Sequence, residues 1–228
     1  MNLKKVISGI SLIMFLLCIQ NATAQERLRI DVSGGYGYRF GEVSDNLPND
    51  VEEYAKELKN GAVFSINAGY FIKENWGLGM YFSQFYSDNS ATFRDAESGA
   101  TVSTSDDITL TLIAPQFLYR TISSNGKHNF ITTFSLGYLD YKNESTFEST
   151  DINFEGGSLG IAAGLNYDFM LSKNIAIGAG FKVIAGSISE FKVSANGQSQ
   201  TVKVEEFSGE ERENLSHLVL SAGLKFYL

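Results

Sequence analysis

The last thirteen residues, Ser216 to Leu228, form a strand-like segment with two contrasting faces. Successive side chains of a β-strand point to opposite sides, so alternate residues form two sets. One set is wholly apolar: Leu218, Leu220, Ala222, Leu224, Phe226 and Leu228. The other set is mostly small or polar: His217, Val219, Ser221, Gly223, Lys225 and Tyr227. A strand of this kind must turn its apolar face either into a protein core or into lipid.

The N-terminus has the pattern of a secretory signal peptide. Lys4 and Lys5 precede an apolar run over 6–19, and Ala22-Thr23-Ala24 follows, which predicts cleavage after Ala24. The run is too short for a transmembrane helix, which needs about 20 residues. We therefore expect a signal peptide over 1–24 and one barrel domain over 25–228. Bulky Leu17 before Cys18 argues against a lipoprotein anchor, so the mature chain is expected to contain no cysteine.

Composition narrows the possible classes of protein. Without the signal peptide, 16 basic residues stand against 26 acidic ones, a net charge near −10 that disfavours nucleic acid as a partner. The chain has 22 Gly, 17 Phe and 11 Tyr but only two Pro, which favours many strands over helices.

Eight segments alternate in the manner of the C-terminal one. They cover 27–40, 61–72, 76–86, 107–121, 130–141, 158–170, 175–190 and 216–228. Three of their connections are short (73–75, 123–129 and 171–174), and four are long (41–60, 87–106, 142–157 and 191–214). Short and long connections alternate along the chain, which is typical of outer-membrane barrels. Within the first long connection, residues 50–59 have apolar residues at helical spacing and predict a short helix.

Aromatic residues cluster on the apolar face near the short connections. They predict a girdle at the membrane interface: Tyr70, Trp76, Phe130, Tyr167, Phe169 and Phe226. A second girdle is expected at the other end from Tyr36, Tyr38, Phe40, Phe82 and Tyr138.

Pro115 interrupts the fourth segment, because proline cannot donate to a strand ladder. Ile108, Leu110 and Leu112 are predicted to face outward before it. We expect a bulge over 114–116, after which Phe117 and Tyr119 face outward.

The whole mature chain resembles the small eight-stranded outer-membrane barrels of the OmpX and OmpA transmembrane-domain type. The last residues also resemble the C-terminal signal read by the barrel assembly machinery, with Ser221, Gly223, Phe226 and Leu228 at its positions; Leu228 replaces the usual Phe. The resemblance implies an all-β, antiparallel, up-and-down transmembrane barrel in the outer membrane of a Gram-negative bacterium. Short periplasmic turns and four long extracellular loops would connect its strands.

The predicted inward face carries polar and charged residues. They are Arg29, Asp31, Arg39, Asn67, Tyr81, Asp168, Lys182, His217 and Lys225. Eight strands leave an interior that side chains can fill, so we expect these groups to pair and plug the lumen; an ion path is the alternative. The sequence predicts no cofactor and no metal site. It also predicts no catalytic residues, because no nucleophile motif such as G-x-S-x-G occurs near His217.

Three functions fit these patterns. The first is a non-enzymatic barrel with a plugged lumen that serves envelope structure, surface interaction or assembly. The second is porin-like transport of small solutes, and the third is a secreted lipocalin-like barrel that binds an apolar ligand.

Most of the 26 acidic residues fall in the long connections. The expected partners are outer-membrane lipid, lipopolysaccharide and the assembly machinery, with an extracellular protein or divalent cations at the acidic loops as a further possibility.

Overall fold

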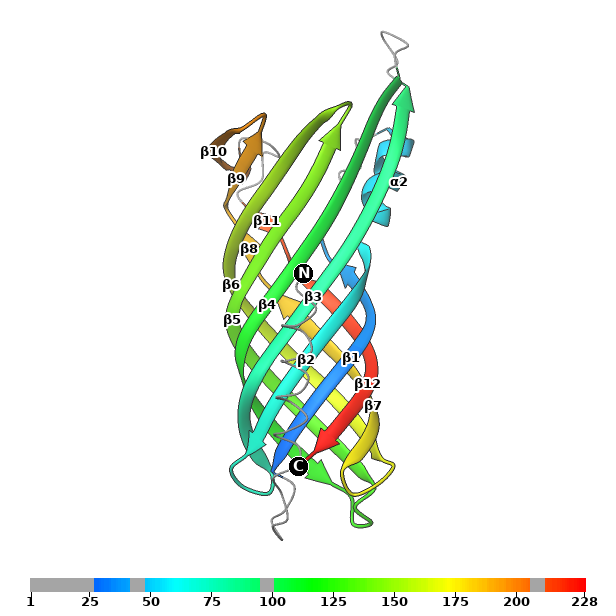
Figure 1. Cartoon of the computed structure of the whole chain (residues 1–228), viewed down its shortest axis with the longest axis vertical. Helices are drawn as coiled ribbons and strands as arrows, with labels where there is room; N and C mark the ends of the chain where they lie inside the picture. Colours follow the sequence, from blue (N-terminus) through cyan, green and yellow to red (C-terminus); the bar gives the residue numbers. More distant parts are fainter. Residues whose placement is uncertain (1–26, 42–47, 95–100, 206–211) are drawn as a thin grey trace, which may run out of the picture.

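Eight antiparallel strands close into a cylinder in the computed structural model, which describes residues 27–41, 48–94, 101–205 and 212–228 (Figure 1). The predicted signal peptide lies outside these residues. The ring consists of β1 (Leu28–Arg39), β2 (Asn60–Phe71), β3 (Trp76–Arg94), β4 (Thr101–Ile122), β5 (His128–Phe147), β6 (Thr150–Met170), β7 (Ile175–Ala185) and β12 (His217–Tyr227). This confirms the predicted eight-stranded barrel.

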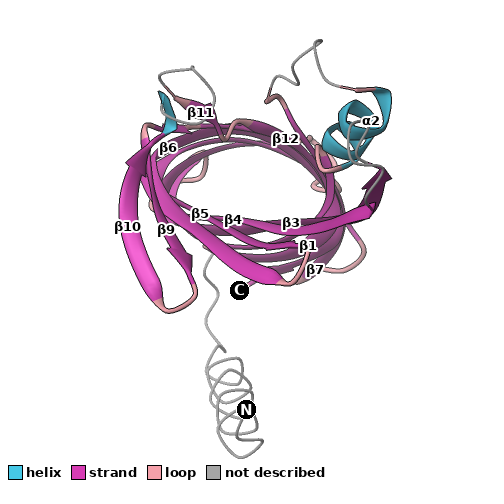
Figure 2. Cartoon of the chain, turned by 90° about the horizontal axis from the view of Figure 1, so that it is seen from above, coloured by secondary structure: helices cyan, strands magenta, loops and turns pink. Residues whose placement is uncertain are grey.

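Each strand pairs with its neighbour in the chain, and β12 closes the ring between β7 and β1 (Figure 2). The closing ladder with β1 runs from Arg29 opposite Tyr227 to Arg39 opposite His217. Gly223 makes this seam possible, because a Cβ there would lie 2.1 Å from the Val32 carbonyl oxygen. The carbonyl of Leu228 accepts hydrogen bonds from the backbone N–H groups of Arg27 and Leu28.

Outward and inward faces differ sharply in exposure. On β6, Leu165 is 61 % exposed and Ala162 is 1 % exposed, and the same alternation follows every strand of the ring. All six residues of the predicted girdle are at least partly exposed on the outward face. An apolar surface this continuous indicates contact with lipid, because a protein surrounded by water seldom exposes such a surface.

The sheet continues beyond the ring on the side away from the short turns. Pairing of β2 with β3 ends at Ala62 and Tyr86, whereas β3 and β4 remain paired to Arg94 and Thr101. The tip of β6 pairs with β9 (Glu190–Ala195), which forms a hairpin with β10 (Gln198–Lys203). The predicted loops over 87–106 and 142–157 are therefore largely strands in their described residues, and a turn joins β5 to β6 at 148–149. Outside the membrane the outward side chains are polar, so the apolar-outward pattern stops before the strands do.

The segment predicted over 175–190 is also divided. β7 ends at Ala185, and the short β8 (Ser187–Ile188) pairs with β11 (Glu213–Asn214). Gly186 lies at this break and exchanges hydrogen bonds with Ser216 through its N–H and carbonyl groups.

The predicted helix over 50–59 is present as α2 (Asn49–Glu57), which packs against the extension of β3. The Tyr54 ring meets Phe93 edge-on at 5.8 Å, and its hydroxyl donates to Asp106 Oδ2 at 2.5 Å. Burial and this carboxylate raise the pKa of the Tyr54 hydroxyl, which keeps it a hydrogen-bond donor. Among the described helices, none is long and apolar enough to cross a membrane.

The predicted orientation of the first half of β4 is wrong. Leu112 is 1 % exposed and Ile113 is 52 % exposed, so Ile108, Leu110 and Leu112 face inward. The expected bulge is absent, because the pairs on both sides of Pro115, Ile113 with Tyr138 and Gln116 with Ser135, have one unbroken register. Phe117 and Tyr119 face outward as predicted.

Two features let the sheet accept Pro115 without a bulge. The β4–β5 ladder is interrupted at Ala114 and Pro115, so no strand pairing there depends on the N–H that proline lacks, whereas pairing with β3 continues through Pro115 opposite Met80. Gly137 on β5 faces this site, where a Cβ would lie 2.2 Å from the Ile113 carbonyl oxygen. The glycine permits close approach of the two backbones and keeps the register intact.

Cysteine labelling tests this orientation directly, because Cys18 is expected to leave with the signal peptide. In protein folded into lipid vesicles, Ile113→Cys should react rapidly with an apolar maleimide dissolved in the bilayer. Leu112→Cys should remain protected until the protein is unfolded. The opposite order of reactivity would restore the orientation expected from the sequence and a bulge at Pro115.

Candidate functional site

The lumen contains all nine of the predicted inward polar residues, each of them buried. They come from β1, β2, β3, β6, β7 and β12, so the closed ring brings together groups that are far apart in the sequence. The closed ring turns these residues inward, and their contacts show which of them form a common network.

Two cations and two carboxylates form the centre of this network. Arg29 donates from Nε to Asp168 Oδ2 at 2.8 Å and from Nη2 to Oδ1 at 3.0 Å. The same Nη2 lies 3.2 Å from Asp31 Oδ2, and Lys225 Nζ donates to Asp31 Oδ1 at 2.5 Å. Tyr227 adds a hydrogen bond from its hydroxyl to Asp168 Oδ2 at 2.5 Å. Each buried charge therefore has an opposite charge beside it, as burial away from water requires.

A second group lies next to this network and includes a lysine on an aromatic ring. Lys182 Nζ sits 3.4 Å from the centroid of the Tyr81 ring, a cation–π contact. Asn67 donates to the Gln116 side-chain oxygen at 2.5 Å. Asp31, Asn67, Tyr81 and Lys182 help to line a cavity of about 10 Å³, which has room for about one water molecule.

An apolar layer fills the lumen between these polar groups and the extracellular side. It includes Val63, Phe85, Leu110, Leu112, Leu139, Ile184 and Val219. Sequence reasoning missed this layer, because it assigned the leucines of β4 to the outward face. The available signal was Pro115 itself: an unbroken alternation through it places Leu110 and Leu112 on the same side as Gln116.

A smaller apolar cluster lies at the short-turn end. Phe71, Leu118 and Ile131 pack together, and the Arg120 guanidinium stacks 3.9 Å from the Phe71 ring centroid. Arg120 also donates to the backbone carbonyl of Glu74 in the β2–β3 turn, at 3.2 Å from Nε and 3.1 Å from Nη2. Along the axis, the described side chains thus form an apolar layer, a polar belt and a second apolar layer.

Arg39 and His217 lie apart from the central belt, near the extracellular end of the ring. Arg39 Nη2 approaches Glu213 Oε1 at 3.2 Å. His217 donates from Nδ1 to the Leu215 carbonyl at 2.9 Å, and its ring lies 5.5 Å from that of Phe85. This histidine is only 1 % exposed, and its observed contacts tie it to the local backbone and the apolar layer.

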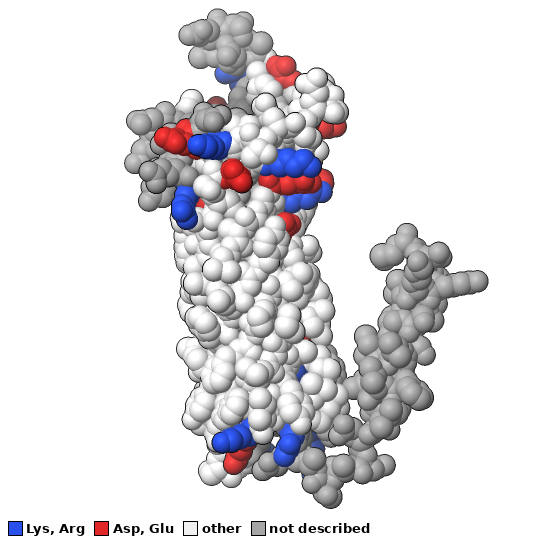
Figure 3. Space-filling view, turned by 90° about the vertical axis from the view of Figure 1, so that its left-hand side faces the viewer, with Lys and Arg blue, Asp and Glu red and all other residues white. Residues whose placement is uncertain are grey.

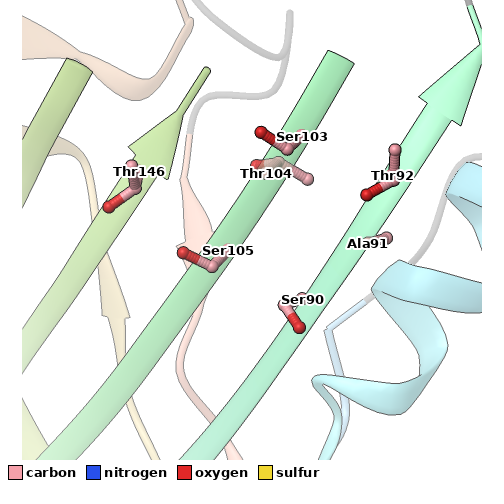
Figure 4. Close-up of a pocket in the computed structure, with 7 residues that line it drawn as sticks. All are labelled: Ser90, Ala91, Thr92, Ser103, Thr104, Ser105 and Thr146. Carbon is pink, nitrogen blue, oxygen red and sulfur yellow. The ribbon is translucent and has the colours of Figure 1, made fainter. Parts of the chain in front are cut away.

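Outside the ring, hydroxyl groups line an open hollow of about 310 Å³ on the extended β3–β4–β5 sheet. The lining residues are Ser90, Ala91, Thr92, Ser103, Thr104, Ser105 and Thr146 (Figure 4). Charged side chains gather at the two ends of the visible face and leave its middle almost free of them (Figure 3). Within the parts of the chain that the structure describes, no group of three or more His, Cys, Asp or Glu residues is placed to hold a metal ion.

Removal of one carboxylate tests whether the polar belt holds the barrel together. Asp168→Ala should destabilise the folded protein by about 3–5 kcal/mol, because it leaves the buried Arg29 guanidinium without its bidentate partner. Asp151→Ala, at an exposed carboxylate, should change the free energy of unfolding by less than about 0.5 kcal/mol. Urea unfolding in lipid vesicles measures both values, and equal effects would contradict a structural role for the belt.

Comparison with known proteins gives one family match and several structural matches for this barrel. The outer membrane protein beta-barrel domain family matches residues 10–226. A major outer membrane protein from Thermus thermophilus is similar in structure (TM-score 0.57, 13 % identity, 88 % of this chain and 99 % of that chain). Neisserial surface protein A is also similar, with a TM-score of 0.52 and 12 % identity over 88 % of this chain and 97 % of that chain. The outer membrane protease OmpT from Escherichia coli has a TM-score of 0.51 and 9 % identity over 92 % of this chain and 99 % of that chain. No curated protein matches the sequence. Because the family match spans nearly the whole chain, this protein belongs to the outer membrane protein beta-barrel domain family.

Proposed function

We propose that this outer-membrane barrel acts with its lumen closed, as a non-enzymatic anchor for its extracellular sheet. Its role would be in surface interaction, envelope structure or assembly of other envelope components. The observation that carries the proposal is the filled lumen: an apolar layer, an ion-paired belt and a second apolar cluster follow one another along the axis. The cavity within the belt has space for about one water molecule and no space for a solute.

The extracellular sheet supports the second half of this proposal. Six strands continue side by side above the ring, in the order β10–β9–β6–β5–β4–β3. At one end, α2 lies against β3, where Ser87 and Asn89 donate to the carbonyls of Leu58 and Tyr54 at 3.1 Å. At the other end, β10 is mostly exposed and pairs with β9 alone among the described strands. An exposed strand edge can pair with an extended segment of another protein.

The alternatives receive less support from the same geometry. The lipocalin-like alternative is wrong, because the chain belongs to an outer-membrane family and its apolar set faces outward. Transport would need a continuous polar path where Phe85, Leu110 and Leu112 now pack together. OmpT is a protease, but at 9 % identity the likeness shows the fold alone, and the observed contacts of His217 are structural.

The proposed partners follow from the surface. The outward apolar band is placed in outer-membrane lipid, and lipopolysaccharide is proposed to surround the extracellular sheet above it. We further propose that the barrel assembly machinery recognises Ser221, Gly223, Phe226 and Leu228 at the C-terminus. An extracellular protein is the proposed partner of the sheet itself, and divalent cations remain a proposal for the acidic end.

Electrical recording tests the closed lumen. Purified protein inserted into planar bilayers should give no stable conductance steps, because its interior is filled. Phe85→Ala removes the largest ring from the apolar layer and should increase leakage, which shows that the assay detects an opening. Folding of both proteins is checked by heat-modifiable gel mobility. Reproducible conductance of the unaltered protein would reject the closed lumen and favour transport.

A further inference from the structure

The periplasmic end of the barrel has a charge opposite to that of the acidic extracellular end. The exposed charges described at the short turns and the N-terminal edge are Arg27, Lys73, Lys127 and Lys173, opposed by the single acid Glu74. Asp31 and Asp168, the other acids at this level, are buried and already paired with Arg29 and Lys225. The water-facing surface here is therefore basic, in contact with the edge of the apolar band.

One part of this edge carries a compact cluster of rings on β5 and β6. His128 Nδ1 and the Tyr167 hydroxyl are 2.7 Å apart, with ring centroids separated by 5.9 Å. Phe169 lies 5.5 Å from His128 and Phe130 lies 5.2 Å from Tyr167. Strand register explains the arrangement, because His128 is opposite Phe169 and Phe130 is opposite Tyr167. We call these four residues the His128 cluster.

Two lysines lie close to the residues of the His128 cluster along the chain. Lys127 directly precedes His128, and its carbonyl accepts a hydrogen bond from the N–H of Met170 at 2.9 Å. Lys173 lies in the turn between β6 and β7, three residues beyond Met170, and is exposed. Ammonium groups attract anionic headgroups, and aromatic rings favour the membrane interface. When Tyr167 donates to Nδ1, the imidazole proton is on Nε2, from which it can be donated to a phosphate oxygen.

We propose that the His128 cluster, together with Lys127 and Lys173, binds the headgroup of an anionic phospholipid of the periplasmic leaflet. The phosphate would lie between the two ammonium groups and His128, and the acyl chains would run from Phe130 along the outward apolar face toward the middle of the barrel. The charge of the surface selects an anionic lipid over a zwitterionic one. The inference concerns the end opposite the extracellular sheet and holds whether the lumen is closed or open.

Fluorescence quenching by brominated lipids tests the site. A reporter is introduced by Thr132→Trp, on the outward face next to the cluster, in a Trp76→Phe background that removes the native tryptophan. Brominated phosphatidylglycerol should quench this reporter more strongly than brominated phosphatidylcholine. The binding constant for the anionic lipid, divided by that for the zwitterionic lipid, should rise by up to about fivefold for each lysine in contact. This follows because a basic residue at an anionic surface contributes about 1 kcal/mol.

Matched variants locate the binding. Lys127→Gln and His128→Gln should each lower the ratio toward one, and Lys173→Gln provides a third variant if either of these fails to fold. Lys73→Gln, in the β2–β3 turn on another part of the rim, should leave the ratio unchanged. A ratio of one in the parent protein would show that there is no preference for the anionic lipid and would overturn the proposal. If Lys73→Gln lowered the ratio as much as Lys127→Gln, the attraction would be diffuse, and the proposal would also be wrong. Loss of the preference on adding soluble glycerol phosphate would likewise reject a lipid as the ligand.

Discussion

Closure of the backbone hydrogen-bond ladder is the constraint on which this structure depends. A bilayer core offers no water to unpaired N–H and C=O groups, so a spanning sheet must have no free edge. Here β12 closes the ring against β1, and these are the last and the first of the described strands. Only above the ring, where water is available, does the sheet open and end in an exposed strand such as β10.

The small circumference of the ring explains what its interior contains. Eight strands enclose a space that side chains can fill, and the chain fills it with two kinds of contact. The leucines of β4 pack with Phe85 toward the extracellular side, while Arg29 and Asp168 pair in the belt. A buried ion pair adds little stability compared with apolar packing, but the loss of one partner is costly. The belt therefore ties β1, β6 and β12 to one arrangement across the lumen.

The two ends of the barrel present different chemistry to their surroundings. The extracellular sheet is acidic and rich in hydroxyl groups, whereas the short turns carry Lys73, Lys127 and Lys173. The outward face between these ends is apolar. This division supports a different proposed partner for each end: a protein and lipopolysaccharide outside, and anionic headgroups on the periplasmic side.

The sequence by itself determined the number of strands and their outward faces in seven of eight segments. It could do so because lipid imposes a strict two-residue period on every spanning strand. It failed at β4, where inward Leu110 and Leu112 are as apolar as a lipid-facing row, so hydrophobicity alone could not distinguish core from bilayer. It also placed the ends of the strands too early, because their outward residues become polar where the membrane ends. Only the tertiary structure decided that Arg29 pairs with Asp168, 139 residues away, since ring closure and strand register bring them together.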